Sequence, residues 1–284
     1  MLNNIFMISL SMSAVILILF IISPILNKRY SAKWRYFVWL ILAVRLIIPF
    51  KVEFGKAPVN LPAPQNQTVV FRTEGIPFAI VENRDNISPS SADYAPVITI
   101  KELIGAIWGI GAIIFLLYHI LSYILFKRKI MPYCNTVNTD ILQEITADMK
   151  IKSSPKLFKC GKIASPMMIG FIRPVILLSD ADYSDNELRI ILKHELTHYK
   201  RCDLWYKLLL VIANSVHWFN PLIYLMARRA NRDLEYSCDD AVIKNCDMNY
   251  RKTYSMAILK AMKKGETTTF STYLGGGAEN EQLY

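Results

Sequence analysis

The fold is decided by the stretch Ser184-Asp185-Asn186-Glu187-Leu188-Arg189-Ile190-Ile191-Leu192-Lys193-His194-Glu195-Leu196-Thr197-His198. Ser184 with Glu187 three residues later forms a capping box, which predicts that a helix begins here. His194 and His198 are four residues apart on one helix face, so both imidazoles can ligate one ion. Glu195, about 100° round the helix, can take a proton from a water held by that ion. The alternative is an exposed helix with two surface histidines.

A catalytic zinc usually has three protein ligands and keeps a fourth position open for water. The candidates for the third ligand are His217, Glu235, Cys238, Asp239 and Asp240. Residues 231–243 read as a helix on which Glu235 and Asp239 share a face. We assign Glu235 as the ligand and Asp239 as the group that hydrogen-bonds a ligand imidazole and fixes its tautomer. Cys238 as ligand is the alternative, and His217 is assigned a structural role.

The residues before this helix predict a small twisted sheet. Short apolar stretches occupy residues 156–160, 167–172 and 175–178, and prolines and glycines separate them. Residues 137–150 read as a short amphipathic helix. A compact α+β domain is therefore expected around the His-Glu-x-x-His motif.

The rest of the chain is unusually apolar. Hydrophobic residues make up 53% of the 284 residues, charged residues 20%, and the mean hydropathy is +0.26. These values exclude a disordered, collagen-like or disulfide-stapled chain. Three runs, 5–26, 34–50 and 103–126, approach or reach the length needed to cross a bilayer. A cleavable signal peptide is the alternative for the first run, but no basic residue precedes it.

Basic residues set the expected orientation. They gather at 28–35 and at 127–129, whereas residues 51–102 hold five basic and six acidic residues. The positive-inside rule then places the N-terminus and residues 51–102 outside, and everything from Lys127 in the cytosol. All five cysteines follow residue 127, which fits reduced cytosolic thiols. The net charge of +10 fits contact with anionic lipid, and we find no nucleic-acid-binding module.

A fourth apolar stretch, residues 204–227, cannot be a simple span. A single crossing would put Glu235 on the opposite side of the membrane from His194 and His198. Pro221 interrupts the stretch near its middle and restricts Asn220 before it. We therefore predict a helical hairpin that dips toward the membrane and returns.

With these motifs placed, the chain resembles the integral-membrane zinc metallopeptidases of the BlaR/MecR type, the beta-lactam sensor-transducer and antirepressor proteins. The matching motifs lie at residues 40–49, 165–178, 194–203, 220–221 and 232–239. The resemblance implies a gluzincin-like zinc endopeptidase with Glu195 as general base. It also implies that substrate is held as an added strand along Met167, Met168, Ile169, Gly170, Phe171 and Ile172. The implied substrate is a cytosolic transcriptional repressor, or the chain itself, in an antibiotic or cell-envelope stress response.

The chain departs from the family after Glu235. Sensor-type members continue into a last span and an external penicillin-binding domain, but no apolar run of 18 residues follows Glu235 here. The expected fold is a mainly α membrane protein with a small α+β cytosolic metalloprotease domain. The chain is expected to be a fragment, a member without the sensor, or one half of a split system. We divide it into two spans (1–50), an external loop (51–102), a third span (103–126), the protease with its hairpin (127–264) and a tail (265–284).

Other functions remain open from the sequence. The same site could serve general membrane-protein quality control, or the chain could be a non-catalytic membrane regulator. Expected partners are the protein substrate, membrane lipid, and either a second copy of the chain or a separate sensor protein. Candidate donors to the oxyanion are Tyr199, His217, Tyr236 and Tyr250, among which spacing does not choose.

Overall fold

The structure is a computed structural model that describes residues 2–48 and 100–263. The expected tail at 265–284 and nearly all of the expected external loop at 51–102 lie outside these residues. In chain order the elements are α1 (Leu2–Arg29), α2 (Ala32–Ile47), α3 (Ile100–Ile130), the 3₁₀ turn η1 (Met131–Tyr133), β1 (Cys134–Thr136), α4 (Asp140–Asp148), β2 (Lys156–Cys160), β3 (Met167–Ile169), β4 (Val175–Ser179), α5 (Asp185–Arg201), α6 (Asp203–Val216), α7 (Pro221–Ile243) and α8 (Met248–Lys263).

Two of the three expected spans have the length and hydropathy of a membrane crossing. Within the described residues these are Ile5–Arg29, with a mean hydropathy of 2.9, and Ile100–Tyr133, with 2.1. The second expected span, at 34–50, is the shorter helix α2 of 16 residues. Its length of about 24 Å falls short of a hydrocarbon core of about 30 Å.

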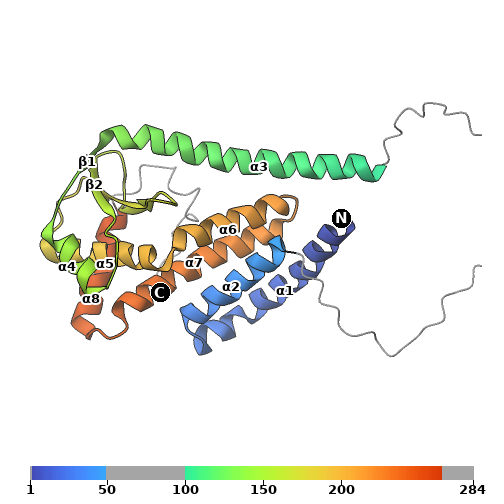
Figure 1. The fold of residues 1–284 in the computed structure, drawn as a ribbon. Helices are drawn as coiled ribbons and strands as arrows, with labels where there is room; N and C mark the ends of the chain where they lie inside the picture. Colours follow the sequence, from blue (N-terminus) through green and yellow to red (C-terminus); the bar gives the residue numbers. More distant parts are fainter. Residues whose placement is uncertain (1, 49–99, 264–284) are drawn as a thin grey trace, which may run out of the picture. The chain divides into compact units, whose positions relative to one another are not determined.

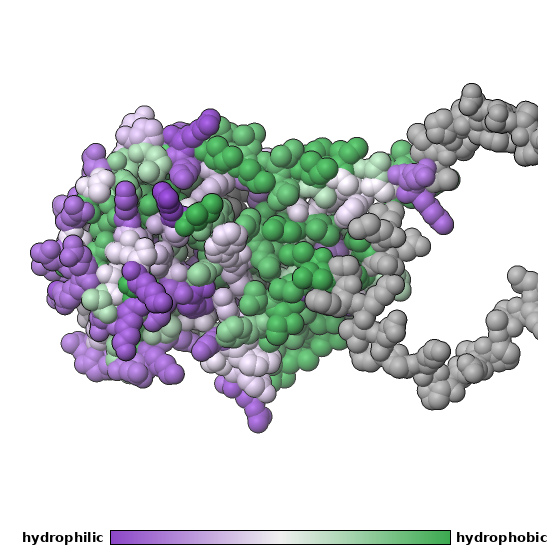
Figure 2. Space-filling view, in the orientation of Figure 1, coloured by the Kyte–Doolittle hydropathy of each residue, from purple (hydrophilic) through white to green (hydrophobic). Residues whose placement is uncertain are grey.

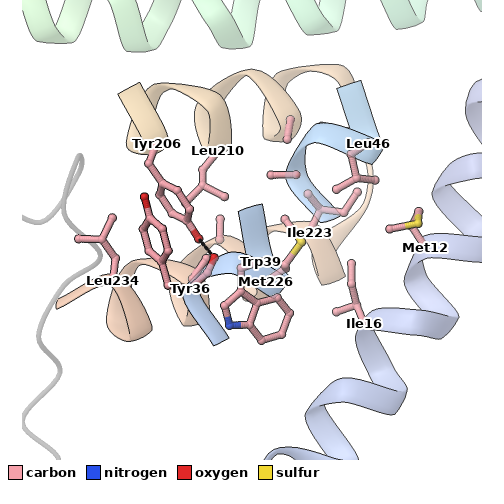
Figure 3. Close-up of a cluster of buried hydrophobic side chains, with 14 residues drawn as sticks. Met12, Ile16, Tyr36, Trp39, Leu46, Tyr206, Leu210, Ile223, Met226 and Leu234 are labelled. Carbon is pink, nitrogen blue, oxygen red and sulfur yellow. Dashed lines mark hydrogen bonds between the residues drawn. The ribbon is translucent and has the colours of Figure 1, made fainter. Parts of the chain in front are cut away.

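The helices α1, α2, α6 and α7 share one hydrophobic core (Figure 1). Figure 3 shows that core, in which Met12 and Ile16 of α1 approach Ile223 and Met226 of α7. The Tyr36 ring of α2 stacks on Tyr206 of α6 with centroids 4.7 Å apart. Burial of this many apolar side chains is what joins the short helix α2 to the bundle.

The predicted helical hairpin is present and is formed by α6 and α7. The interruption falls where the sequence placed it, because α6 ends at Val216 and α7 begins at Pro221. One detail of the expectation was wrong. The second arm does not end at residue 227 with a separate helix after it; α7 is continuous from Pro221 to Ile243. A single rigid helix therefore carries Glu235 back from the turn.

Side chains pair with several polar groups of the hairpin turn. Asn220 caps α7 by accepting from the Leu222 backbone N–H, and its amide donates to Ser9 Oγ and Ser13 Oγ at 2.8 and 2.7 Å. His217 Nε2 lies 3.1 Å from the Leu46 carbonyl oxygen. Because an apolar surrounding offers no water to these groups, such internal pairing is required there.

The hairpin turn lies beside the first turns of α1 and the N-terminal half of α3. Phe219 contacts Phe6, near the start of α1, with ring centroids 4.9 Å apart. Trp218 and Trp108 each donate to a backbone carbonyl of the other's segment, Trp218 to Trp108 O at 3.2 Å and Trp108 to Val216 O at 2.9 Å. Gly111 leaves room for the Trp218 ring, which a Cβ there would overlap. The hairpin turn thus lies beside the ends of α1 and α3 that are opposite to their basic last turns.

The small sheet has the strand order β1-β2-β4-β3. β2 and β4 are parallel, and the two outer strands are antiparallel to their neighbours. The three predicted strands are confirmed, while β1 was not predicted. β3 is shorter than expected and ends at Ile169, because Gly170 has a φ of +96° and a Cβ there would meet the Arg173 carbonyl. Gly170, Phe171 and Ile172 therefore belong to the turn after β3.

One face of the sheet packs on α4 and α5 through buried side chains such as Leu157, Ile176 and Leu192. Thr139 caps α4, as a short amphipathic helix requires. Figure 2 shows hydrophilic residues gathered over the part of the protein with the sheet, and hydrophobic residues over the apolar helices. The motif helix α5 is thus held by the polar, sheet-bearing part of the fold.

A buried carboxylate ties α2 to α7. Asp233 has no exposed side-chain surface and accepts from Arg35 Nε at 2.9 Å and from Trp39 Nε1 at 2.8 Å. Arg35 and Trp39 are four residues apart on α2, so both face the same residue of α7. The pairing fixes the register of α2 against α7, two residues before Glu235.

We expect Asp233→Ala to lower the stability of the chain in detergent by about 3 kcal/mol, because it leaves the Arg35 charge and the Trp39 N–H without a partner. Thermal unfolding followed by circular dichroism measures this. Asp240→Ala, at an exposed position of the same helix, is the matched control and should change stability by less than about 0.5 kcal/mol. Equal unfolding temperatures for the two variants would contradict the assigned role.

Candidate metal centre

The motif helix begins and ends as its sequence requires. Both halves of the capping box are formed, since Ser184 Oγ accepts from the Glu187 N–H and Glu187 Oε2 accepts from the Ser184 N–H. The helix ends at Cys202, which has a left-handed φ of 58°. His194 and His198 lie in its last two turns and are oriented by residues beyond this bend.

Three atoms from two helices converge at this helix. His194 Nε2 and His198 Nε2 are 3.1 Å apart, and Glu235 Oε2 of α7 lies 3.1 Å from His198 Nε2 and 3.8 Å from His194 Nε2. A tetrahedral ion with N and O ligands at about 2.0–2.2 Å separates those ligands by about 3.3–3.6 Å. The three separations lie within about 0.2 Å of that range, so small shifts of these side chains would let the three atoms ligate one zinc ion. The structure carries no ion, and the fit rests on these distances and on the donor types.

The other oxygen of Glu235 is held from α6. Lys207 Nζ donates to Glu235 Oε1 at 3.1 Å. The carboxylate thus turns Oε2 toward the histidines and Oε1 toward the ammonium group. Glu195 is 8% exposed, and its charge also acts on Lys207. Lys207 thus lies between the charges of Glu235 and Glu195.

Asp203 orients His198. Its Oδ2 lies 2.7 Å from His198 Nδ1, and its other carboxylate oxygen pairs with Arg201 Nε at 3.4 Å. The Asp203 side chain is almost fully buried. A carboxylate on Nδ1 keeps the proton on that nitrogen and leaves the Nε2 lone pair free for a metal.

His194 has a different pair of partners. Its Nδ1 lies 2.8 Å from the Tyr254 hydroxyl and 3.3 Å from Asp239 Oδ1. The Tyr254 hydroxyl donates to the same Asp239 oxygen at 2.6 Å. The structure thus places Asp239 beside His194, as assigned from the sequence, and puts a tyrosine of α8 closer still.

Cys238 is the competing ligand. Its thiol and the two histidines present ligand atoms that all lie within 4.8 Å of one another. The sulfur is 3.8 Å from His194 Nδ1 and 3.6 Å from the His194 carbonyl oxygen. That nitrogen already has Tyr254 and Asp239 as partners, whereas Glu235 faces both Nε2 atoms. Cys238 also pairs with His198, so the described contacts leave both Glu235 and Cys238 as candidates for the third ligand.

The charges of the metal-free site follow from these contacts. Burial lowers the pKa of His194, but hydrogen bonds to Asp239 and Cys238 outweigh it and raise the pKa to about 10. Burial raises the pKa of Glu235, but Lys207 and the hydrogen bond from His198 bring it well below its usual value. A metal must then displace protons from the histidines, so its affinity should fall as the pH is lowered from about 10.

Other residues singled out from the sequence lie elsewhere. His217 is buried at the hairpin turn on the Leu46 carbonyl, as its structural assignment expected, and the Tyr199 hydroxyl donates to the Ser153 carbonyl. Asp240 is exposed on α7. Sequence reasoning missed the roles of Lys207, Asp203 and Tyr254. Of the three, only Asp203 could have been found from the sequence, because it is an acidic residue placed just after the His-Glu-x-x-His helix.

We expect Asp203→Ala to weaken zinc binding by roughly 10- to 100-fold, because the His198 ring loses the group that fixes its tautomer and orientation. Competition with a chelator of known affinity measures the change. Asp182→Ala, an exposed position before α5, should bind zinc as the wild type does. Wild-type affinity in Asp203→Ala would show that Asp203 does not hold a ligand.

Comparisons with known proteins show which family the chain belongs to. Residues 3–282 match the peptidase family described as Peptidase M56, BlaR1 peptidase M56. The chain is 26% identical over 257 residues to the regulatory protein BlaR1 of Bacillus licheniformis, covering 86% of this chain and 43% of that protein. It is 24% identical over 284 residues to the methicillin resistance mecR1 protein of Staphylococcus aureus, covering 92% and 46%. The chain spans less than half the length of these relatives, and it belongs to the BlaR1 peptidase M56 family.

Proposed function

We propose that the chain is a membrane-embedded zinc endopeptidase that cleaves a cytosolic regulatory protein. The observation that carries the proposal is the convergence of His194 Nε2, His198 Nε2 and Glu235 Oε2 within 3.8 Å. Family membership supports the peptidase reading. The proposed ligands leave one tetrahedral position open, which is typical of catalytic and not of structural zinc sites.

Glu195 is the proposed general base. Zinc bound here would supply Lewis-acid polarisation of the scissile carbonyl and a lowered pKa for water. Glu195 follows His194 directly on α5 and is largely buried, and its proposed role is to accept the proton of the attacking water. Lys207 and Asp203 hold the neighbouring groups in place. The Glu235 side chain is 44% exposed, which leaves the site open to a substrate.

The edge of the sheet offers a place for the substrate backbone. β3 is an outer strand, with β4 on one side only, and it contacts α5. A peptide added along Met167–Ile169 would hydrogen-bond to the free edge of β3. The proposed binding edge is shorter than the six residues expected, since Gly170, Phe171 and Ile172 turn away from the strand direction after Ile169.

We place the site on the cytosolic side. Lys28 and Arg29 end α1, and Lys127, Arg128 and Lys129 lie in the last turn of α3. Arg229 of α7 donates to Ser23 and Asn27 near that basic end of α1, and Glu235 lies six residues further along α7. The metal centre is thus near the basic ends of the helices, which the positive-inside rule assigns to the cytosol.

The regulatory role rests on the relatives. Their names describe regulatory and methicillin resistance proteins, which favours regulated cleavage in an antibiotic response. A cytosolic transcriptional repressor, or the chain itself, is the proposed substrate. General quality control of membrane proteins uses the same chemistry and is the second candidate. A second copy of the chain or a separate sensor remains a proposed partner, with membrane lipid around the apolar helices.

We expect Glu195→Gln to slow cleavage of a candidate repressor, and any self-cleavage, by about 100-fold or more, because the amide cannot accept the proton from water. Loss of full-length substrate on gels measures this with the purified chain in detergent. Zinc content should stay at the wild-type level, since Glu195 is not a proposed ligand.

Glu144→Gln is the matched control, because Glu144 is exposed on α4 and paired only with Arg189 in the surface ion pair described. It should cleave at the wild-type rate. Equal cleavage by wild type and Glu195→Gln would defeat the peptidase proposal. Cleavage of denatured membrane proteins but of no repressor would move the function to quality control.

A further inference from the structure

Tyr254 connects the candidate metal centre to α8, an element outside the family motifs. Its side chain is buried, and the whole residue is only 4% exposed. The hydroxyl lies 2.8 Å from His194 Nδ1 and donates to Asp239 Oδ1 at 2.6 Å. One phenol group therefore joins residues of α5 and α7 at the back of the His194 ring.

The direction of these hydrogen bonds is fixed by the metal. If Nε2 of His194 gives its lone pair to zinc, the ring proton must be on Nδ1, which then donates. The Tyr254 oxygen is the nearer acceptor at 2.8 Å, against 3.3 Å for Asp239 Oδ1. Because Asp239 takes the tyrosine proton, the hydroxyl oxygen is turned toward the imidazole. The chain of donors runs from His194 through Tyr254 to Asp239.

We propose that Tyr254 is a positioning residue for zinc, through which Asp239 orients His194 and through which α8 controls the site. The inference rests on the proposed zinc site at His194, His198 and Glu235. Asp239 keeps its own contact with His194 Nδ1 at 3.3 Å, and the inference adds a shorter route through the Tyr254 hydroxyl.

The docking of α8 supplies the structural basis for this control. Tyr254, Ala257 and Ala261 lie on one face of α8, and all three are buried. Ala257 and Tyr254 pack with Ile190 of α5, and Lys260 pairs with Glu187 at 2.7 Å. Small alanines allow α8 to approach α5 closely, which brings the tyrosine hydroxyl within reach of His194. Displacement of α8 would withdraw that hydroxyl from the ligand.

The test compares zinc affinity of the full chain in detergent, by chelator competition, for wild type, Tyr254→Phe and Tyr133→Phe. Tyr133 is the matched control, since it is 53% exposed and lies in the turn η1 before the sheet. We expect Tyr254→Phe to bind zinc about tenfold or more weakly. Tyr133→Phe should stay within about twofold of wild type. Thermal unfolding of the zinc-free proteins reports whether the fold is intact.

A second arm tests the order of the hydrogen bonds. If Asp239 acts on His194 through Tyr254, the two substitutions remove the same interaction. The double variant Asp239→Ala with Tyr254→Phe should then lose about as much zinc affinity as the weaker-binding of the two single variants. Additive losses would overturn the relay, because they would show Asp239 acting on His194 independently.

Zinc affinity of Tyr254→Phe within about twofold of wild type would overturn the inference. A loss matched by an equal fall in zinc-free stability would also overturn it, since Tyr254 would then be structural only. If wild type binds no zinc, the proposed function itself fails. If the wild type binds zinc and Tyr254→Phe binds it equally well, the proposed function still holds and only the inference about Tyr254 fails.

Discussion

One metal ion can be shared only by groups a few ångströms apart, and the proposed zinc site therefore depends on how the chain returns to it. His194 and His198 precede the apolar α6, while Glu235 follows it on α7. The chain must therefore go into the apolar bundle and come back within the span of two helices. The turn at Asn220 and Pro221 makes that return possible, because Pro221 starts α7 without needing a hydrogen-bond partner. Asn220 then secures the turn to α1.

The continuity of α7 links the apolar helix bundle to the proposed metal centre. Asp233 is buried against Arg35 and Trp39 of α2, and Glu235 lies two residues later toward the two histidines. Two residues along a helix are about 200° round its axis, so the two carboxylates point to different sides. The same rigid element is thus held by the bundle on one side and presents Glu235 on the other. A shift of α7 against α2 would move Glu235.

Much of this could be predicted because the signals are local. The capping box fixed where α5 begins, the prolines and glycines marked the strands β2, β3 and β4, and Pro221 marked the hairpin turn. Other features depend on distant contacts. Nothing near Tyr254 indicates that α8 packs on α5, and nothing near Lys207 indicates that it faces Glu235 across the hairpin. β1 has only three residues and exists because β2 offers it a partner.

The ligand set is the central claim, and X-ray absorption at the zinc edge of the metal-loaded chain tests it most directly. The account predicts only nitrogen and oxygen ligands at about 2.0–2.2 Å, with the imidazole signature of two histidines. A sulfur neighbour at about 2.3 Å would contradict it. That result would make Cys238 the third ligand and leave Glu235 as a charge held by Lys207 beside the metal.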